Sequence, residues 1–291
     1  MMNMPGPLVG TEWLAGQIGA PDLRILDATV FLHPNPDGFG YTTESGRAKF
    51  AEGHLTGTQF VDLIEEFSDQ TTDVKFMMPS PERFCALAGA LGVGDDSRVV
   101  IYSSGSPMWA TRLWWMFRSV GFDNCAVLDG GLAKWKREGR ALTTEVDVPL
   151  PAYLTPRPRP DLWASVDTVR AAMNDAGVCT INALSPAVYT GEKNTYGRAG
   201  HIPGSVNVFY DTLLDAQEGT FLPPAQLKPL FEQVGAYSRP RVICYCGGGI
   251  SATMDAMALT VTGHADIAVY DGSMWEWVAD PALPLKLGAE A

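Results

Sequence analysis

The sequence predicts an α/β protein with two tandem domains, each a mainly parallel sheet flanked by helices on both faces. Three observations support this fold class. Short apolar segments of strand length alternate with segments of helical length, which is typical of parallel sheets covered on both faces. The same order of segments occurs twice, and such self-similarity indicates a duplicated structural unit. A proline-rich segment separates the two copies.

The two copies share six features in the same order. The first copy has a strand at 23–28, a turn at 53–58, a helix at 80–91, a strand at 98–102, an apolar helix at 110–120 and a final strand that ends in Asp129, with Trp135 six residues later. The second copy has these features at 178–183, 200–205, 224–234, 241–245, 252–262 and in a strand that ends in Asp271, with Trp277 six residues later. We therefore expect two copies of one fold.

The segment between the copies is expected to be extended. Five prolines between residues 149 and 160 fix φ and remove backbone donors, so the segment should form a semi-rigid linker. The predicted domains are residues 1–148 and 161–291, joined by the linker at 149–160.

Composition excludes several classes of protein. A net charge of −12 argues against nucleic acid or an anionic membrane as the main partner. No apolar run approaches the ~18 residues of a membrane span. The five scattered cysteines do not form a disulfide framework, and the N-terminus lacks the pattern of a secretory signal. We expect a cytoplasmic protein whose thiols are reduced.

The most informative stretch is the loop that follows the strand at 241–245. Cys246 ends this strand, Gly247, Gly248 and Gly249 follow it, and a helical segment begins at Ala252. The start of a helix leaves backbone N–H groups without partners and favours an anion. The same environment lowers the pKa of a thiol, so Cys246 is predicted to be a nucleophilic thiolate. Glycines let the backbone donors approach a sulfur anion closely.

A rival interpretation of these glycines is a dinucleotide-binding motif. Residues 247–252 match the G-x-G-x-x-A pattern, and Asp271 follows at about the expected distance. The first copy keeps the corresponding Asp129 but lacks the glycines, so the aspartate belongs to the shared fold. Too few residues follow Asp271 to complete a dinucleotide domain, and we expect no such cofactor.

Phosphoryl transfer and metal binding are also disfavoured. A cysteine-loop phosphatase needs an arginine six residues after its cysteine, where this chain has Ala252. Cys244 and Cys246 lack a second Cys or His pair nearby, so we expect no zinc site. Cys244 fits best in the core, and a role as a resolving thiol is the alternative.

Together, these motifs resemble the tandem-domain rhodanese family of thiosulfate and 3-mercaptopyruvate sulfurtransferases. The resemblance covers nearly the whole chain, from about Leu8 to Leu287. It rests on the segments 112–115 and 129–131 in the first copy, and on 200–205, 246–251 and 270–273 with Trp277 in the second.

The resemblance implies an inert first domain and a catalytic second domain. Ser103 stands in the first copy where Cys246 stands in the second, and the proline at 107 removes a donor. The implied reaction has two steps: Cys246 takes a sulfur atom from a small anionic donor, and a thiol or cyanide then takes it from the persulfide. The loop from Gly247 to Ser251, including Ile250, would surround that sulfur, with the Ser251 hydroxyl as one more donor.

The donor site is less well defined by the sequence. Arg198 and Lys193 precede the turn at 200–205, and Arg112 can face the cleft between domains in this family. His201 and His54 occupy matching turns, which favours a structural role over a catalytic one.

Neither subtype of the family is fully matched. Thiosulfate enzymes usually carry basic residues after the cysteine, and mercaptopyruvate enzymes an arginine after the second domain's first strand; both are missing here. The donor therefore stays open between thiosulfate and 3-mercaptopyruvate. A non-catalytic sulfur-binding or sensing protein is the alternative function.

Overall fold

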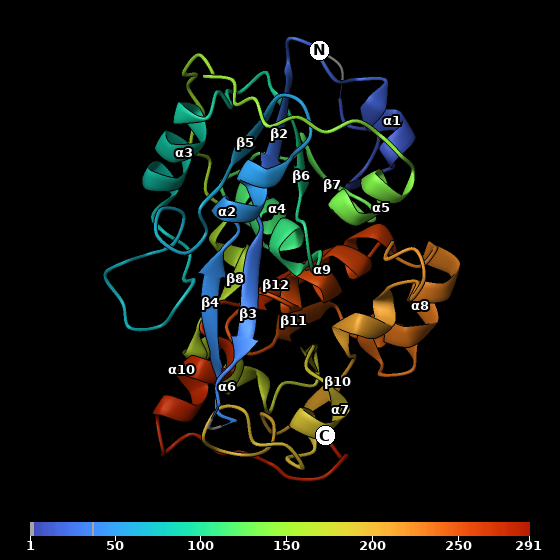
Figure 1. Cartoon of the computed structure of the whole chain (residues 1–291). Helices are drawn as coiled ribbons and strands as arrows, with labels where there is room; N and C mark the ends of the chain where they lie inside the picture. Colours follow the sequence, from blue (N-terminus) through green and yellow to red (C-terminus); the bar gives the residue numbers. More distant parts are fainter. Residues whose placement is uncertain (1–2, 37) are drawn as a thin grey trace.

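The computed structural model describes residues 3–36 and 38–291. The described chain forms two units, one above the other in Figure 1, each with a five-stranded parallel sheet. The strands of the first sheet lie within residues 8–128 and those of the second within 163–270, on either side of the predicted linker. The predicted fold class is confirmed.

The two sheets have the same topology. The first has the order β1 (Leu8–Val9), β7 (Cys125–Leu128), β6 (Arg98–Tyr102), β2 (Leu23–Asp27) and β5 (Thr58–Phe60). The second has β8 (Trp163–Ala164), β12 (Asp266–Tyr270), β11 (Arg241–Tyr245), β9 (Val178–Asn182) and β10 (Ser205–Asn207). The central strands β6 and β11 follow continuous apolar runs because both of their faces are covered.

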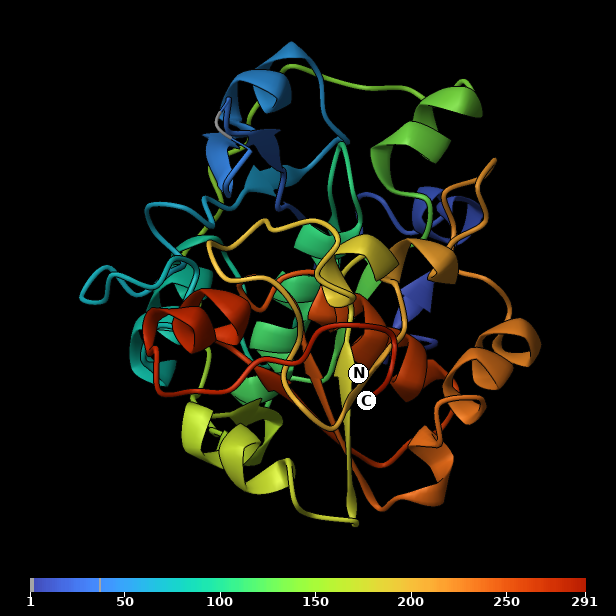
Figure 2. The ribbon, with the colours of Figure 1, turned by 90° about the horizontal axis from the view of Figure 1, so that it is seen from below.

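Helices cover both sheets. The first unit contains α1 (Thr11–Ala15), α2 (Arg47–Glu52), α3 (Pro81–Ala90), α4 (Met108–Ser119) and α5 (Gly131–Arg137). The second contains α6 (Val166–Ala172), α7 (Pro186–Tyr189), α8 (Pro224–Glu232), α9 (Ala252–Val261) and α10 (Ser273–Ala279), with single 3-10 turns η1 (Pro160–Leu162), η2 (Tyr210–Leu213) and η3 (Ala236–Ser238). Seen from below, α6 and α10 lie at one side of the second unit and α8 at the other (Figure 2).

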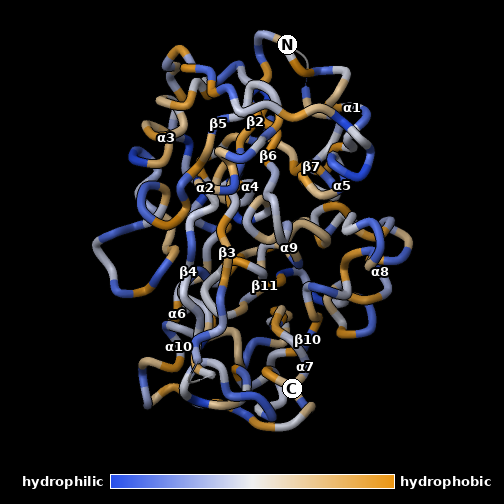
Figure 3. Tube along the Cα trace, viewed as in Figure 1, coloured by the Kyte–Doolittle hydropathy of each residue, from blue (hydrophilic) through white to orange (hydrophobic). Residues whose placement is uncertain are grey.

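The units are joined most closely where α4 packs against α9. Both helices are apolar on nearly every side, which is expected of helices enclosed by protein all round. Between them the hydroxyl groups of Thr111 and Thr253 form a hydrogen bond of 2.8 Å. Hydrophobic residues run through the strands of the first sheet (Figure 3). None of the described helices is long and apolar enough to cross a membrane.

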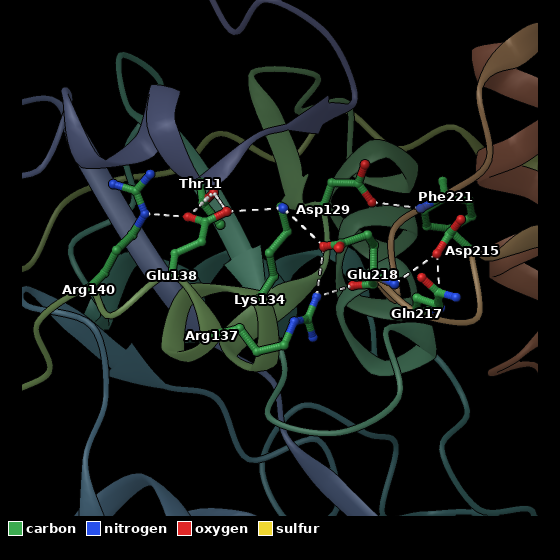
Figure 4. Close-up of polar contacts among 10 residues, drawn as sticks. All are labelled: Thr11, Asp129, Lys134, Arg137, Glu138, Arg140, Asp215, Gln217, Glu218 and Phe221. Carbon is green, nitrogen blue, oxygen red and sulfur yellow. Dashed lines mark hydrogen bonds and ion pairs between the residues drawn. The ribbon is translucent and has the colours of Figure 1, made fainter.

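A second contact between the units is polar and lies near α5. Lys134 and Arg137 form ion pairs with Glu218 at 3.3 Å and 3.0 Å, and the Asp129 carboxylate accepts a hydrogen bond of 2.8 Å from the Phe221 amide (Figure 4). The aspartate directly after β7 therefore contacts the second unit.

A β-hairpin that the sequence did not predict forms a third contact. Strands β3 (Val30–Pro34) and β4 (Tyr41–Ser45) pair antiparallel and extend from the first unit down to the second (Figure 1). At the tip, the Gly40 amide donates a hydrogen bond of 2.7 Å to the Thr195 carbonyl. The first unit thus reaches the loop that precedes β10.

The linker is extended, and it lies along the first unit. Its backbone amides at Ala152, Arg157 and Arg159 donate to carbonyls of α3 and of the end of α4, at distances of 2.7–2.9 Å. These bonds hold the segment in place between the two units.

Candidate active site

Cys246 lies at the centre of the second sheet's carboxyl edge. It follows the last residue of β11, the middle strand, and is separated from α9 by the glycine loop. Its side chain is 2% exposed. Ligands of open parallel sheets bind at this edge, outside the carboxyl ends of the strands. The predicted nucleophile therefore occupies a position suited to chemistry.

The hydroxyl group of Ser273 organises the loop. It accepts hydrogen bonds from the Cys246 and Gly249 amides at 3.1 Å and 3.0 Å and donates to the Tyr270 carbonyl at 2.6 Å. Ser273 has a φ of +50°, which is unusual for a residue other than glycine. The sequence showed Ser273 only as part of a family motif, and its role depends on contacts between distant residues.

Two of the loop glycines are required by close packing. A β-carbon on Gly249 would lie 2.5 Å from the Asp271 carbonyl oxygen, and the φ of Gly249 is +69°. A β-carbon on Gly247 would lie 2.2 Å from the phenolic oxygen of Tyr196. Only glycine fits at both places.

Backbone donors of the loop point to an anion site. Within the described part of the chain, the amides of Gly247, Gly248, Ile250 and Ser251 donate to no acceptor, and neither does the Ser251 hydroxyl. The 10-residue helix α9 begins directly after them and adds the positive end of its dipole. A thiolate or persulfide at Cys246 is the anion that such donors favour.

Arg112 is not free to bind a substrate. Its guanidinium donates to the Asp271 carboxylate at 2.6 Å, to the Gly249 carbonyl at 3.2 Å and to the Phe76 carbonyl. Its side chain is 1% exposed and stacks over the Trp163 ring at 4.6 Å. Contrary to the expectation that it binds the donor, Arg112 connects α4 of the first unit to the catalytic loop through Gly249 and Asp271.

Arg198 is occupied by other contacts, whereas Lys193 stays a candidate for binding the donor. Arg198 donates to the carbonyls of Asp280 and Leu283 at 2.9 Å and 2.8 Å, so it anchors its loop to the segment after α10. Lys193 is exposed and forms no ion pair with any residue that the structure describes. Of the predicted cations, only Lys193 is available to an anion in solution.

The two candidate histidines are structural. The ring nitrogens of His54 contact the Phe50 and Glu145 carbonyls, and those of His201 contact the Tyr189 and Glu290 carbonyls, at 2.8–3.1 Å. Both side chains are fully buried. They have no capacity left for a substrate and are removed from the candidate binding residues.

Cys244 lies in the core. It is 0% exposed, and burial raises its pKa well above that of an ordinary thiol. A buried neutral thiol is a poor nucleophile, so the structure argues against a resolving role.

Aromatic residues near Cys246 were not identified from the sequence. Tyr196 lies against Gly247, and its ring meets that of Trp275 edge-on at 5.2 Å. Burial raises the pKa of Tyr196, and negative charge on Cys246 raises it further. The same two causes act on Tyr210. No periodicity or spacing marks these residues, because loops far apart in the chain bring them together.

Comparison with known proteins identifies the family. The family description "Rhodanese-like domain" matches residues 10–138 and again residues 165–280. The chain belongs to the rhodanese family. The two matched segments correspond to the two units of this rhodanese, as its internal repeat predicts.

Named relatives match over almost the whole chain. The 3-mercaptopyruvate sulfurtransferase of Escherichia coli (strain K12) is 32% identical over 96% of this rhodanese and 97% of its own length. The thiosulfate sulfurtransferase of Bos taurus is 32% identical over 93% and 91%. A crystal structure of SseA from Escherichia coli, described as a 3-mercaptopyruvate sulfotransferase, has a TM-score of 0.80 at 30% identity and covers 92% of this chain and 98% of its own. This rhodanese is a sulfurtransferase, and that prediction is confirmed.

Proposed function

We propose that this sulfurtransferase carries sulfur on Cys246 as a persulfide. The thiolate attacks the sulfur atom of the donor, forming a sulfur–sulfur bond as the donor's own bond to that sulfur breaks. Thiosulfate would leave as sulfite, and 3-mercaptopyruvate as pyruvate after it gains a proton. A thiol or cyanide then takes the outer sulfur and restores the thiolate.

The free backbone donors of the loop carry this proposal. Four amides at residues 247, 248, 250 and 251 donate to no acceptor in the described chain, although the loop is packed against Ser273 and Asp271. Unpaired donors in a buried loop are unfavourable unless a ligand or water accepts their hydrogen bonds. A persulfide anion would accept several of them at once, which stabilises the product of the first step.

We further propose that 3-mercaptopyruvate is the better donor. Thiosulfate is a dianion, and its transfer from water requires compensating positive charge. Arg112, which contacts the loop at the Gly249 carbonyl, is neutralised by Asp271. The protein as a whole is acidic, with a net charge of −12. A monoanionic donor needs less compensation, and backbone donors supply it.

The experiment that tests this function is intact-mass spectrometry after incubation with each donor. Wild-type protein should gain one sulfur atom and lose it when cyanide or a thiol is added. Cys246→Ser should gain none and keep its fold. Cys85→Ser is the matched control, because Cys85 is a buried thiol of α3 in the first unit, and it should still form the adduct.

Two results would contradict the proposal. Absence of the adduct with both donors would exclude the persulfide mechanism. An adduct that no acceptor removes would favour a sulfur-binding or sensing protein instead. We also propose a reducing, cytoplasmic location, where the five free cysteines stay reduced.

A further inference from the structure

Tyr196 is the polar side chain that packs against the residue directly after Cys246. Its phenolic oxygen occupies the space where Gly247 would otherwise have a β-carbon, 2.2 Å from that position. The residue comes from the loop between α7 and β10, and the side chain is 9% exposed. The hydroxyl is therefore directed at the catalytic loop and is nearly enclosed.

Several contacts fix Tyr196 in this position. Its ring meets Trp275 at 90°, and the backbone of Trp275 donates to the Gly247 carbonyl at 2.9 Å. The neighbouring Thr195 carbonyl accepts the hydrogen bond from the hairpin tip at Gly40. Two residues later, Arg198 anchors the loop to the C-terminal segment. A side chain held from three directions is preorganised for binding.

The Tyr196 hydroxyl has no hydrogen-bond partner in the described part of the chain. It forms no bond to a described residue, and it is not among the fully enclosed polar atoms that lack partners, so some of its surface is accessible. A buried tyrosine hydroxyl ordinarily finds a partner. Burial and the charge of Cys246 raise its pKa, which keeps the proton on the oxygen. The group is therefore available as a donor.

Trp275 extends this wall toward solvent. Its side chain is 39% exposed, and its Cδ1 atom lies 3.3 Å from where a β-carbon of Gly248 would be. The two aromatic side chains thus cover consecutive glycines of the loop. They present a neutral surface with one free hydroxyl.

We propose that the Tyr196 hydroxyl donates a hydrogen bond to an oxygen of the sulfur donor and, with the face of Trp275, determines which donor is accepted. This inference rests on the proposed function. It assigns donor recognition to a neutral group, in place of the arginines at 112 and 198, which are occupied elsewhere. The favoured donor is a small monoanion with a carbonyl or carboxylate oxygen next to its sulfur-bearing carbon.

The test compares Tyr196→Phe with wild-type protein in the two half-reactions. Loss of the hydroxyl should lower kcat/KM for 3-mercaptopyruvate by about tenfold or more, mainly through KM, because a hydrogen bond to a charged oxygen is lost. Transfer from the preformed persulfide to cyanide should be unchanged, because the donor has already left. A merely structural tyrosine would alter both half-reactions together.

Two control variants accompany this comparison. Tyr237→Phe makes the same chemical change in η3, where the hydroxyl donates to the Thr262 hydroxyl at the end of α9, and should leave both half-reactions unchanged. Lys193→Met removes the one predicted cation that is available, and its rise in KM for 3-mercaptopyruvate should be smaller than that of Tyr196→Phe.

Three results would overturn the inference while the proposed function stands. They are equal kcat/KM values for Tyr196→Phe and wild type, a larger rise in KM for Lys193→Met, or a wild-type KM that rises steeply with ionic strength. The last needs no variant, since recognition by a neutral group depends weakly on salt. Absence of any persulfide in wild-type protein would instead remove the proposed function and this inference with it.

Discussion

The two units share a framework and differ at the loop after their central strands. In both, the tyrosine that ends the strand, Tyr102 or Tyr245, accepts a hydrogen bond from the amide that follows a buried histidine, His54 or His201. In both, the histidine ring stacks on an aromatic ring at 3.8 Å. Both copies have therefore kept the tyrosine and histidine contacts next to the loop.

The two loops differ in whether their hydrogen-bond donors have partners within the protein. In the first unit the Ser104 amide donates to the Thr29 hydroxyl at 2.8 Å, and the Ser103 hydroxyl donates within its own loop. Leu184 occupies the position of Thr29 in the second unit, since both amides bond to the side chain two residues earlier. Leucine has no acceptor, so the Gly247 amide stays free. The comparison shows that one unit satisfies its loop internally while the other keeps donors for a ligand.

The largest expected effect concerns Arg112, which has no counterpart in the second unit. Equivalent threonines precede Arg112 and Met254, but only Arg112 pairs with an aspartate across the interface. Arg112→Met should destabilise the protein by about 3–5 kcal/mol, because the buried Asp271 loses its counterion. Urea denaturation followed by circular dichroism measures this change.

A matched pair of variants makes the result interpretable. Met254→Leu should cost less than ~1.5 kcal/mol, because it conserves volume in the corresponding helix. Arg112→Met combined with Asp271→Asn should recover part of the loss. Equal midpoints for Arg112→Met and wild type would show that the buried ion pair contributes nothing to the interface.

The next effect concerns Ser273, whose counterpart in the first unit is Gly131. Both residues have positive φ, +50° and +55°, but only Ser273 supplies a hydroxyl to the loop. Ser273→Gly should reduce sulfur transfer by about 10- to 100-fold, since two loop amides lose their acceptor and the loop loses its geometry. Steady-state kinetics with 3-mercaptopyruvate measures the loss.

The stabilities of two variants at Ser273 show whether a loss of activity is caused by unfolding. Ser273→Gly removes the backbone strain together with the hydrogen bonds, whereas Ser273→Ala removes only the bonds and should be the less stable variant. Unchanged kcat in both variants would mean that the loop keeps its shape without the hydroxyl.

The smallest effect concerns Asp129, which lacks the arginine that Asp271 has. Burial raises the pKa of Asp129 from 3.8 to about 6. The folded protein then binds more protons than the unfolded chain between these values, so this group lowers the stability as pH rises from about 4 to about 6. In Asp129→Asn, the free energy of unfolding should therefore fall by about 1 kcal/mol less over this pH range than in the wild type, after allowance for partial exposure.

The measurement is the free energy of unfolding at pH 4 and pH 7 for both proteins. Asn keeps an oxygen that accepts the Phe221 amide, so the contact at the interface is retained. Burial also raises the pKa of Asp27 to about 6, and both proteins share that contribution. The opposite sign, a wild type that gains more stability than the variant as pH rises, would mean that Asp129 is paired in solution.

Much of the fold follows from local sequence. The apolar runs at 98–102 and 241–245 coincide with β6 and β11 because a central parallel strand is hydrophobic on both faces. The hairpin β3–β4 was missed, since apolar and polar residue types do not alternate along either strand and its tip packs on the second unit. Its stability depends on contacts that no local pattern contains.

Only those residues of the candidate site that are adjacent in sequence could be predicted. Cys246 and its glycines lie next to one another in sequence, so their pattern was visible. The ion pair of Arg112 was not visible in the sequence, because its partner Asp271 is 159 residues away. Tyr196 and Ser273 likewise depend on long-range packing. Proximity in sequence suggested Arg198 and the family resemblance suggested Arg112, but Arg198 donates to two backbone carbonyls and Arg112 pairs with Asp271.

The hydrogen bond between Thr111 and Thr253 joins equivalent positions of the two units. A contact between equivalent residues marks an approximate twofold axis, as in a homodimer. This rhodanese therefore has the interior of a symmetric dimer whose subunits are consecutive segments of one chain. Covalent connection fixes their effective concentration. The half without the catalytic cysteine thus behaves as a permanent subunit, and dilution cannot separate it from the catalytic half.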